Sequence, residues 1–438
     1  MAQGSESFLA ELEWRGLLHQ TAGQGLGDHL GAGPRTAYTG FDPSADSLGV
    51  GNLVPLSIMR MWQRAGHKPI LLVGGATGMI GDPGGKDAER NLLSEEEVRH
   101  NVECQTNSIR SLFTWEDEDP KGGARLVNNV DWWRDLSFMN VLRDIGKHFS
   151  VNAMIQRDSV KDRLENRDQG ISFTEFSYML LQAYDFLHLY KTADCTVQIA
   201  GSDQYGNCVS GMDLIRRDAA THGTDADSFV VTTPLLLKAD GKKFGKSESG
   251  NVWLSPERTS PYAFYQFWIN ASDDDVSRFL RTFTLFPREE IESIEQEHAA
   301  APHQRAAQQQ LAEYVTASVH GADELARVQA ASGALFGKGD LRELDAKMLG
   351  DVFADVPSST HAKTELEKDG VSLADLLPET TLAKSKREAR EYLKNGAISI
   401  NGQKATPETR LVTSDLLHGK TILIKRGKKL WHATQWPQ

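Results

Sequence analysis

A short basic loop offers the clearest chemistry in this sequence. Three lysines, a glycine and a serine fall within the six residues Lys242–Ser247, directly after a turn. Buried ammonium groups are costly unless they are paired, so such a loop does not belong in a packed core. Its positive charge, and a glycine that lets the backbone approach closely, suit a polyanion such as the phosphates of a nucleotide. Taken alone, the loop fits a solvated basic turn equally well.

A second segment, near the N-terminus, is also suited to phosphate. Gly49 and Gly51 lead into an amphipathic helix that the pattern predicts over 53–65, and Asn52 is a candidate N-cap residue. The N-terminus of a helix presents free N–H groups and the positive end of the helix dipole, which together favour anions.

The pattern around these segments predicts an α/β, Rossmann-like nucleotide-binding domain. One strand ends near Thr39, and another over 69–73 leads into a glycine-rich loop over 74–82. Strands and helices that alternate in this way, with glycine loops at the strand ends, are typical of doubly wound sheets. The sequence fits neither a P-loop, because Ile80 replaces a required glycine, nor the dinucleotide fingerprint, because Val54 replaces its third glycine.

A helix predicted over 173–189 is apolar on most sides but carries a polar stripe. Tyr178, Gln182 and Asp185 are spaced i, i+4 and i+7, so they share one face. Polar groups on a buried helix need partners. The stripe therefore either contacts other core groups or lines a pocket for a polar ligand.

Another polar loop, Gly201–Asn207, follows a strand predicted over 196–200. Asp203 comes just past that strand end, a common place for an acidic residue that binds ribose hydroxyls. Turns favour the same residue types, so an ordinary turn remains the alternative.

Length and composition predict a multidomain globular protein. A chain of 438 residues is long for one domain, and its 39% hydrophobic and 25% charged residues are ordinary for such proteins. We find no apolar run of membrane-spanning length and no secretory signal in the first fifteen residues. The three cysteines form neither a zinc-binding spacing nor a disulfide framework. These features predict a cytoplasmic protein that does not span a membrane.

Charge is divided unevenly along the chain. Residues 379–438 hold 12 Lys and Arg against 5 Asp and Glu, a net charge of +7, whereas the whole chain carries −12. A basic tail on an acidic body suggests contact with a polyanion, with a solvated basic face as the alternative. The expected organisation is a catalytic domain over 1–235 with an insertion at about 128–195, the basic loop and its connection over 236–259, a helical domain over 260–352, a linker over 353–371 and a C-terminal domain over 372–438.

The tail carries local structural signals. Ser385 and Glu388 form a capping-box pattern at the start of a helix that Gly396 ends. Asn401-Gly402 predicts a hairpin, and a further strand is expected over 421–425. Basic groups on a helix face and a strand turn suit an RNA backbone.

The order of these segments resembles the bacterial tyrosyl-tRNA synthetases, a family of class I aminoacyl-tRNA synthetases. The stretches that carry the resemblance are 38–43, 73–83, 146–152, 170–185, 201–207, 243–247 and 260–270, and the tail matches as well. The resemblance implies that tyrosine and ATP form tyrosyl-adenylate, and that tyrosine then passes to the terminal adenosine of its tRNA. It also implies Mg²⁺ bound with ATP rather than by the protein, an anticodon-binding helical domain and a small RNA-binding tail of a ribosomal-protein type. It further implies a homodimer through the segment around residues 130–165, whose apolar residues could equally be core: Trp132, Trp133, Phe138, Met139 and Val141.

Roles for single residues follow from the same resemblance. Tyr38 and Asp185 would hydrogen-bond the phenol of tyrosine. The residues implied for its amino group and carboxyl end are Tyr178, Gln182, Asp82, Asn129, Gln198 and Gln204. Those implied for ATP are Gly40, Asp42, Gly51, Gly201, Asp203 and Lys246. Those implied for the reaction at the phosphates are Lys243, Lys246 and Ser247, together with Ser44, Gly49, Asn52, Lys86 and Arg90.

One departure from the family is marked. The family signature is His-x-Gly-His, and this chain reads Gly49-Val50-Gly51-Asn52. Gly49 lacks the side chain that binds phosphate in the family, and the loss of one such donor typically costs about 3–4 kcal/mol. An amide at Asn52 can still donate, and either Ser44 or a closer backbone approach at Gly49 would compensate.

The departure keeps a second function open. An active tyrosine–tRNA ligase is the principal hypothesis, and a non-catalytic or weakly catalytic RNA-binding paralogue is the alternative. An enzyme that supplies tyrosyl-adenylate to another acceptor is disfavoured, because the basic tail suits RNA. Tryptophan specificity is disfavoured as well, because Tyr38 and Asp185 suit a phenol better than an indole.

Overall fold

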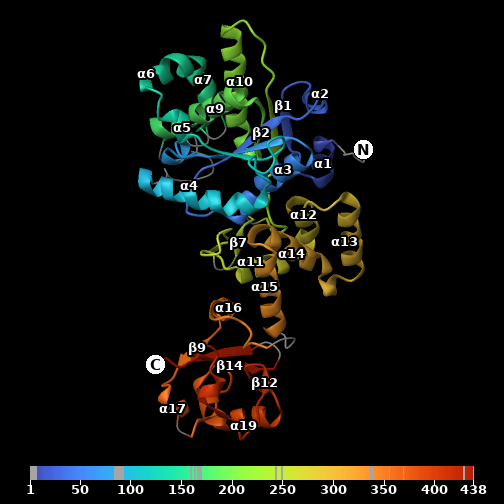
Figure 1. Cartoon of the computed structure of the whole chain (residues 1–438), viewed down its shortest axis with the longest axis vertical. Coiled ribbons are helices and arrows are strands. Elements are labelled where there is room, and N and C mark those ends of the chain that lie inside the picture. Colours follow the sequence, from blue (N-terminus) through green and yellow to red (C-terminus); the bar gives the residue numbers. More distant parts are fainter. Residues whose placement is uncertain are drawn as a thin grey trace. The chain divides into compact units, whose positions relative to one another are not determined.

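A computed structural model describes residues 7–82, 93–157, 160–161, 164, 170–241, 244–247, 250–335, 340–354, 356–367, 369–427 and 430–437. The chain divides into two units (Figure 1), an N-terminal unit of residues 1–259 with 267–319 and a C-terminal unit of residues 260–266 with 320–438. In the described part of the chain, no helix is long and apolar enough to cross a membrane. Cys104, Cys195 and Cys208 are free thiols.

The N-terminal unit is built on a six-stranded sheet with the order β1-β6-β5-β2-β3-β4. Every neighbouring pair is parallel except β1 and β6, which are antiparallel. The strands are β1 (Gln20–Ala22), β2 (Thr36–Phe41), β3 (Lys68–Val73), β4 (Arg125–Asn128), β5 (Cys195–Gly201) and β6 (Phe229–Thr233). The order of the five parallel strands reverses between β2 and β5, which is where doubly wound sheets bind their ligands. The predicted α/β fold class is confirmed.

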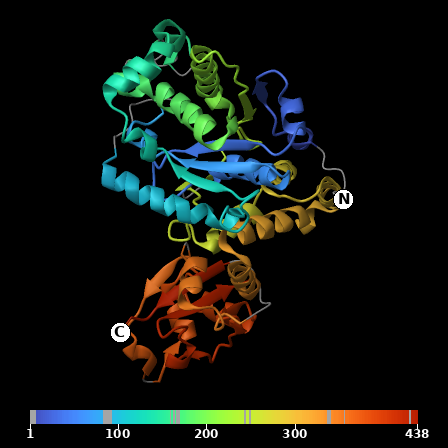
Figure 2. The same cartoon turned by 45° about the horizontal axis from the view of Figure 1, so that its top comes forward.

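Helices cover both faces of this sheet. Figures 1 and 2 show α9 (Phe173–Ala193) and α10 (Tyr205–Thr221) on one face and α4 (Glu95–Ile109) on the other. Helix α3 (Leu53–Arg64) follows β2 and packs on β3. Apolar residues of α9, among them Ala183, Phe186 and Leu187, pack against Tyr38 and Leu72 of the sheet. Burial of this apolar face is what holds the polar stripe of α9 against the sheet.

Shorter elements connect these strands and helices. They are α1 (Phe8–Arg15), α2 (Leu26–Gly31), η1 (Val50–Asn52), η2 (Thr77–Met79), η3 (Arg110–Leu112), α5 (Val130–Trp133), α6 (Phe138–Asn140), η4 (Val141–Ile145), η5 (Gly146–His148), α7 (Val151–Ile155) and η6 (Ser202–Gln204). Past the sheet, β7 (Lys246–Ser247) pairs in antiparallel fashion with β8 (Gly250–Asn251).

The segment after Ser260 is mostly helical, as the sequence predicts. Its elements are α11 (Pro261–Ile269), α12 (Asp273–Phe283), α13 (Arg288–Ala300), η7 (Pro302–Gln304), α14 (Ala306–His320), α15 (Ala322–Leu335) and α16 (Ala346–Val352). The boundary between the two units falls within α11, so residues 267–319 belong to the N-terminal unit.

The C-terminal unit contains a five-stranded sheet with the order β12-β11-β14-β15-β9. Its strands and helices are β9 (Ser358–Thr360), α17 (Thr364–Glu367), β10 (Val371–Ser372), α18 (Leu373–Leu376), η8 (Leu377–Glu379), α19 (Lys386–Lys394), β11 (Ile398–Ile400), β12 (Gln403–Lys404), β13 (Arg410–Leu411), η9 (Thr413–Asp415), β14 (Thr421–Arg426) and β15 (Leu430–Gln435). Residues 353–371, expected as a linker, therefore supply β9, which pairs in parallel with β15.

Local signals in the tail are confirmed with one adjustment. Ser385 caps α19 by accepting a hydrogen bond from the N–H of Glu388, but the Glu388 carboxylate accepts from Lys384 rather than from Ser385. Asn401 and Gly402 both have positive φ, 45° and 89°, as a tight hairpin between β11 and β12 requires.

Candidate active site

A cavity of about 310 Å³ opens at the carboxyl ends of β2 and β5, where the strand order reverses. Strands β2 and β5, helix α9 and the loops after β2, β3 and β5 all contribute to its wall. The predicted site residues that line it are Tyr38, Gly40, Asp42, Ser44, Asn52, Asp82, Tyr178, Gln182, Asp185, Gln198, Asp203 and Gln204. The polar stripe of α9 thus faces a cavity rather than other core groups.

Asp185 lines the cavity and is held by three hydrogen-bond donors. Both indole N–H groups of Trp132 and Trp133 donate to Oδ1 at 2.8 Å, and Asn129 Nδ2 donates to Oδ2 at 2.9 Å. Burial raises the pKa of the Asp185 carboxyl to about 7, although all three hydrogen bonds act to lower it. A carboxylate has about four acceptor positions, so one remains for a ligand.

Tyr38 is buried beside the same cavity with its hydroxyl unused. Its Oη has no hydrogen-bond partner among the described residues, and its ring packs on Phe186 with a centroid distance of 5.4 Å. Burial raises the pKa of this phenol well above its usual value, so the hydroxyl keeps its proton. Because buried hydroxyls normally find a partner, Tyr38 Oη is a ready contact for a polar ligand in the cavity.

The family resemblance assigns Asp185 to the phenol of tyrosine, and the pKa of its carboxyl turns that assignment into a prediction. Below pH 7 the carboxyl takes up a proton, and under this assignment it stops being a charged acceptor for the phenol. Tyrosine affinity should therefore fall as pH drops from 8 to 6, by up to about tenfold per pH unit once the carboxyl titrates. Equilibrium dialysis with radioactive tyrosine would measure it.

Phenylalanine serves as the matched control ligand, because it has the same amino and carboxyl groups but no phenol. The ratio of tyrosine affinity to phenylalanine affinity should fall with falling pH. A constant ratio between pH 8 and 6 would contradict the assignment of Asp185 to the phenol.

Asp42 also lines the cavity and accepts two side-chain hydrogen bonds there. Its Oδ1 accepts a hydrogen bond from Thr77 Oγ1 at 2.8 Å, and its Oδ2 accepts one from the Tyr178 hydroxyl at 2.9 Å. A β-carbon at Gly74 would lie 2.2 Å from Thr77 Oγ1 and 2.5 Å from Asp42 Oδ1. Glycine at position 74 is thus required for this contact.

A second chain of hydrogen bonds links further residues of the cavity. Gln204 Nε2 donates to Asp82 Oδ2 at 2.6 Å, and Asn207 Nδ2 donates to the side-chain oxygens of Gln204 and Gln182, at 3.0 and 3.1 Å. At the end of β5, a β-carbon on Gly201 would lie 2.5 Å from Asp203 Oδ1. The small residue lets this carboxylate lie close to the backbone.

Among the residues that replace the family signature, Asn52 uses its side chain differently from the N-cap role that the sequence predicts. Asn52 makes no side-chain cap on α3, and its Oδ1 accepts a hydrogen bond from the Gly49 N–H at 3.1 Å. The predicted N-cap role is therefore wrong, because the amide turns back toward Gly49. A β-carbon at Gly49 would meet Val252 O at 3.5 Å, an ordinary contact, so the backbone has room for a β-carbon there.

The basic loop approaches this signature at Gly245. Gly245 has φ +93°, and a β-carbon on it would lie 3.3 Å from Val50 Cγ2 and 3.5 Å from the Gly51 N. Its carbonyl accepts a hydrogen bond from Val252 at 3.1 Å. The two phosphate-type segments predicted separately from the sequence therefore meet. Lys86, Arg90 and Lys243 lie outside the described residues, and Lys246 and Ser247 are described only as backbone in β7.

Asn129 is placed differently from its predicted role. It is fully buried, does not line the cavity, and uses its amide on Asp185, Thr77 and the Ala76 N–H. It therefore supports the carboxylate that the family resemblance assigns to the phenol, instead of the amino-group end. Trp132 and Trp133 share this task and were not among the predicted site residues. The only hint in the sequence is that adjacent tryptophans carry two donor N–H groups.

Comparison with known proteins gives consistent matches along the chain. A family model described as tRNA synthetases class I (W and Y) matches residues 32–337, and a model of the tyrosine–tRNA ligase SYY-like C-terminal domain matches residues 349–434. A tyrosine–tRNA ligase of Porphyromonas gingivalis is 47% identical over 432 residues, covering 97% of this chain and 99% of the relative. One of Roseiflexus castenholzii is 49% identical over 427 residues, covering 97% and 98%. A C-terminally truncated mitochondrial tyrosyl-tRNA synthetase of Aspergillus nidulans has a TM-score of 0.68 and 31% identity, over 76% of this chain and 95% of that chain.

Proposed function

Because the chain belongs to the tyrosine–tRNA ligases, the tyrosine-specific members of the class I tRNA synthetases, we infer the chemistry of its cavity from that family's reaction. An oxygen of the tyrosine carboxylate attacks the α-phosphate of ATP, and the bond from that phosphorus to pyrophosphate breaks. The product is tyrosyl-adenylate. A hydroxyl of the terminal adenosine of the tRNA then attacks the tyrosyl carbonyl, and AMP leaves. Charged tRNA is used in translation, so we place the reaction in the cytoplasm.

The presence of Tyr38 and Asp185 in one cavity is the observation that supports tyrosine as the substrate. Tyr38 offers an unused hydroxyl, and Asp185 offers one free acceptor position in the same cavity. We propose that the substrate phenol donates to Asp185 and hydrogen-bonds Tyr38. Phenylalanine would leave the Tyr38 hydroxyl without a partner and the free acceptor position of Asp185 empty, which is costly in a buried site.

Other residues of the cavity take the remaining groups of the two substrates. We propose that Tyr178, Gln182 and Asp82 hold the amino group, with Gln198 in support, and that Gln204 faces the carboxyl end. Gly40, Asp42 and Gly51 border the adenylate, and Gly201 and Asp203 hold the ribose. Lys243 and Lys246 neutralise the departing pyrophosphate and Ser247 donates a hydrogen bond to it, with assistance from Ser44, Lys86 and Arg90.

ATP enters as its Mg²⁺ complex in this proposal, so the ion is part of the substrate. Within the described ranges, no group of three or more His, Cys, Asp and Glu is arranged to hold a metal ion. The protein contributes positioning and positive charge, which are the main sources of rate in a reaction without a protein nucleophile.

The decisive test is tyrosine-dependent exchange of pyrophosphate into ATP by the pure protein. We expect exchange with tyrosine and none above background with tryptophan. Tyrosine-dependent charging of tRNA would exclude the alternative, a non-catalytic RNA-binding paralogue, which Gly49 keeps open. Binding of tRNA without any exchange would instead establish that alternative.

Gly49 supports a second prediction at the signature. Because a β-carbon there meets only ordinary contacts, we expect the backbone to accept Gly49→His, which would add a donor near the phosphates. We expect the exchange rate to rise by about tenfold or more, part of the 10²–10³ that one oxyanion donor typically contributes.

Gly49→Ala is the matched control, because it adds the same β-carbon without a donor. A gain with histidine and none with alanine would show that the natural site is impaired. Equal rates for the two variants would contradict this and indicate a site already compensated around glycine.

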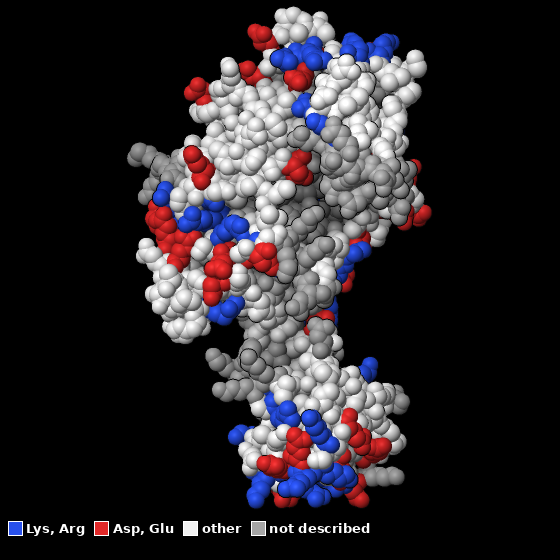
Figure 3. Space-filling model, turned by 180° about the vertical axis from the view of Figure 1, so that it is seen from behind, with Lys and Arg blue, Asp and Glu red and all other residues white. Residues whose placement is uncertain are grey.

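The C-terminal unit is proposed to bind the backbone of the tRNA. Figure 3 shows many Lys and Arg side chains on it, interspersed with Asp and Glu. On α19, the exposed basic residues are Lys386, Arg387, Arg390 and Lys394. Basic side chains gathered on one helix suit phosphate contacts, which carry much of the affinity for nucleic acids. By the same family resemblance, the helical segment after Ser260 would approach the anticodon.

We also propose a homodimer through the segment between β4 and α9. Phe138 and Met139 in α6 are 63% and 70% exposed, and Val151 in α7 and Phe173 at the start of α9 are 57% and 68% exposed. Large apolar side chains gathered in one segment usually mark an interface. Of the residues predicted there, Trp132 and Trp133 instead contact Asp185.

A paired charge substitution tests the dimer. The wild type should sediment as a dimer at micromolar concentration, and Phe138→Glu with Met139→Glu should sediment as a monomer. Leu430→Glu, at an exposed leucine of the C-terminal unit, is the control that should stay dimeric. A monomeric wild type at tens of micromolar would contradict the proposal.

A further inference from the structure

Phe244, in the middle of the basic loop, is surrounded by aromatic rings. Its ring centroid lies 5.7 and 5.8 Å from those of Phe267 and Trp268 in α11, and 5.0 and 5.3 Å from those of Phe279 and Phe283 in α12. We call these four rings the aromatic box. Phe283 lies nearly parallel to Phe244, at 24°, whereas Phe267 and Phe279 meet it edge-on. Such offset and edge contacts fix the orientation of a ring as well as its depth.

The segment that leads into the loop is held by the same helix, α12. Asp275 Oδ1 accepts a hydrogen bond from the Ala239 N–H at 2.9 Å, and the Arg278 guanidinium donates to the Leu237 carbonyl. Arg278 also pairs with the buried carboxylate of Asp275, at 2.6 Å. The chain is therefore attached to α12 before the loop begins and again at Phe244.

On its other side, the loop contacts the signature. Gly245 lies against Val50 and Gly51, and β7 continues from it through pairing with β8. The backbone at Phe244–Gly245 is thus held between α12 and the residues that precede α3.

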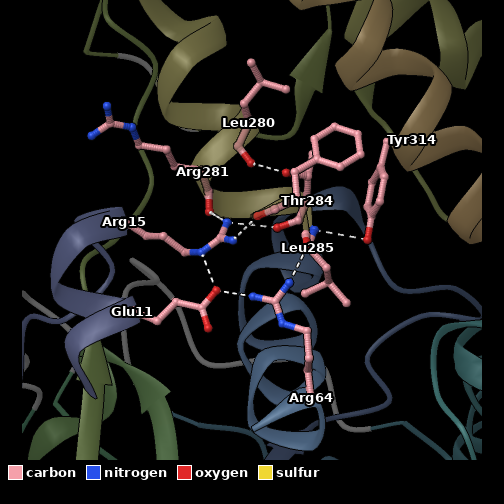
Figure 4. Close-up of polar contacts among 9 residues, drawn as sticks. Glu11, Arg15, Arg64, Leu280, Arg281, Thr284, Leu285 and Tyr314 are labelled. Atoms are coloured by element: carbon pink, nitrogen blue, oxygen red, sulfur yellow. Dashed lines mark hydrogen bonds and ion pairs between the residues drawn. The ribbon is translucent and has the colours of Figure 1, made fainter. Parts of the chain in front are cut away.

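Helix α12 is itself fixed to α3. Arg64, at the end of α3, donates to the carbonyl of Leu285, and Arg15 of α1 donates to the carbonyls of Arg281 and Thr284 (Figure 4). Since α3 begins directly after Asn52, the aromatic box and the signature belong to one connected framework. A displacement of Phe244 would shift the loop relative to the signature.

We propose that Phe244 is a positioning residue: by seating its ring in the aromatic box, it holds the backbone of the basic loop beside the signature. The inference rests on the proposed function, in which lysines of this loop neutralise the departing pyrophosphate. Phe244 itself touches no substrate in this scheme, so it should act on adenylate formation and leave tyrosine binding alone.

Truncating the ring tests the proposal. Phe244→Ala should lower the rate of tyrosyl-adenylate formation, at saturating tyrosine and ATP, by about 10²-fold, the usual size of the effect when a group is displaced by about 1 Å. Its Kd for tyrosine without ATP should stay within about twofold of the wild type. That binding measurement also shows that the variant is folded. Phe244→Leu keeps much of the apolar volume and should recover most of the rate.

The partner ring supplies a sharper measurement. Phe283→Ala should slow adenylate formation as Phe244→Ala does, and the double variant should be little slower than either single one, because both remove the same contact. Phe113→Ala, a buried ring that does not line the cavity, is the control for lost stability and should leave the rate within about twofold.

Two results would overturn the inference while the wild type exchanges pyrophosphate normally. One is a Phe244→Ala rate within about threefold of the wild type, and the other is full multiplication of the two single effects in the double variant. A wild type without any exchange would refute the proposed function instead.

Discussion

Replacing Asp185 by asparagine is expected to lower kcat/KM for tyrosine by about 10²- to 10³-fold, although the two side chains have nearly the same shape. The expected loss corresponds to about 3–4 kcal/mol, the sum of a charge-assisted hydrogen bond to the substrate and a new unfavourable contact in a buried site. Selectivity for tyrosine over phenylalanine should fall with it, because the phenol would lose its acceptor.

The arrangement of donors around Asp185 explains why an amide does not fit. Two indole N–H groups point at Oδ1, and the Asn129 amide N–H points at Oδ2. An asparagine at position 185 would replace either Oδ1 or Oδ2 by an NH₂ group. That NH₂ group would face an N–H donor that it cannot accept from. Asn129 does not relieve the conflict by turning over, because its Oδ1 already accepts from the Ala76 N–H at 2.7 Å. The surroundings therefore select a carboxylate.

Steady-state exchange with tyrosine and with phenylalanine would measure both effects. Asp194→Asn is the matched control, since it makes the same chemical change at the exposed end of the same helix, in a left-handed conformation that asparagine tolerates. It should leave both rates unchanged. An Asp185→Asn enzyme with tyrosine kinetics within about fivefold of the wild type would contradict the role given to Asp185.

The shared face of the polar stripe on α9 was predictable from periodicity, whereas the sequence left open whether that face lines a cavity. Tyr178, Gln182 and Asp185 recur at helical spacing, and their shared face follows from geometry alone. Tyr38 and Gln198 lie on the neighbouring parallel strands β2 and β5, but only the family resemblance pointed to them. The helical spacing needs no knowledge of which side chains touch.

Side-chain partners were not predictable in the same way. Trp132, Trp133 and Asn129 reach Asp185 from more than 50 residues away along the chain. No local pattern encodes such pairings, which depend on how α5 packs against α9. The partner of Asn52 was not predictable either, although it lies nearby in the chain. The same amide can cap α3 or accept a hydrogen bond from the Gly49 N–H, and the sequence does not decide between them.

The region expected as a linker shows a different limit. The segment 358–360 is polar and only three residues long, and its own pattern does not predict a strand. They form β9 because the open edge of β15 offers hydrogen bonds to an extended segment. A three-residue strand is too short to show a periodic pattern, and its formation depends on pairing with a strand far along the chain.

The largest effect on stability is expected at Arg15. Its side chain is buried between α1 and the end of α12, and Figure 4 shows its contacts. The guanidinium donates to the carbonyls of Arg281, Thr284 and Phe286, at 2.7, 2.9 and 2.8 Å, and its Nε pairs with Glu11 at 3.0 Å. Burial lowers the pKa of Arg15, but arginine stays charged at neutral pH.

Arg15→Met should destabilise the N-terminal unit by about 3–5 kcal/mol, because it removes one partner of a buried ion pair and leaves three carbonyls without their donor. For a unit of this size, the calorimetric transition should drop by on the order of 5–10 °C. Arg15→Lys should melt between the wild type and Arg15→Met, because a single ammonium group does not reproduce the planar guanidinium that reaches three carbonyls at once. Arg99→Met is the control, because Arg99 pairs with Glu95 at a site where both side chains are more than two-thirds exposed, and it should shift the transition little. If Arg15→Met melted within about 1 °C of the wild type, the junction between α1 and α12 would not contribute to the stability of the unit, and the fixed position of α12 that the aromatic box requires would lose its support.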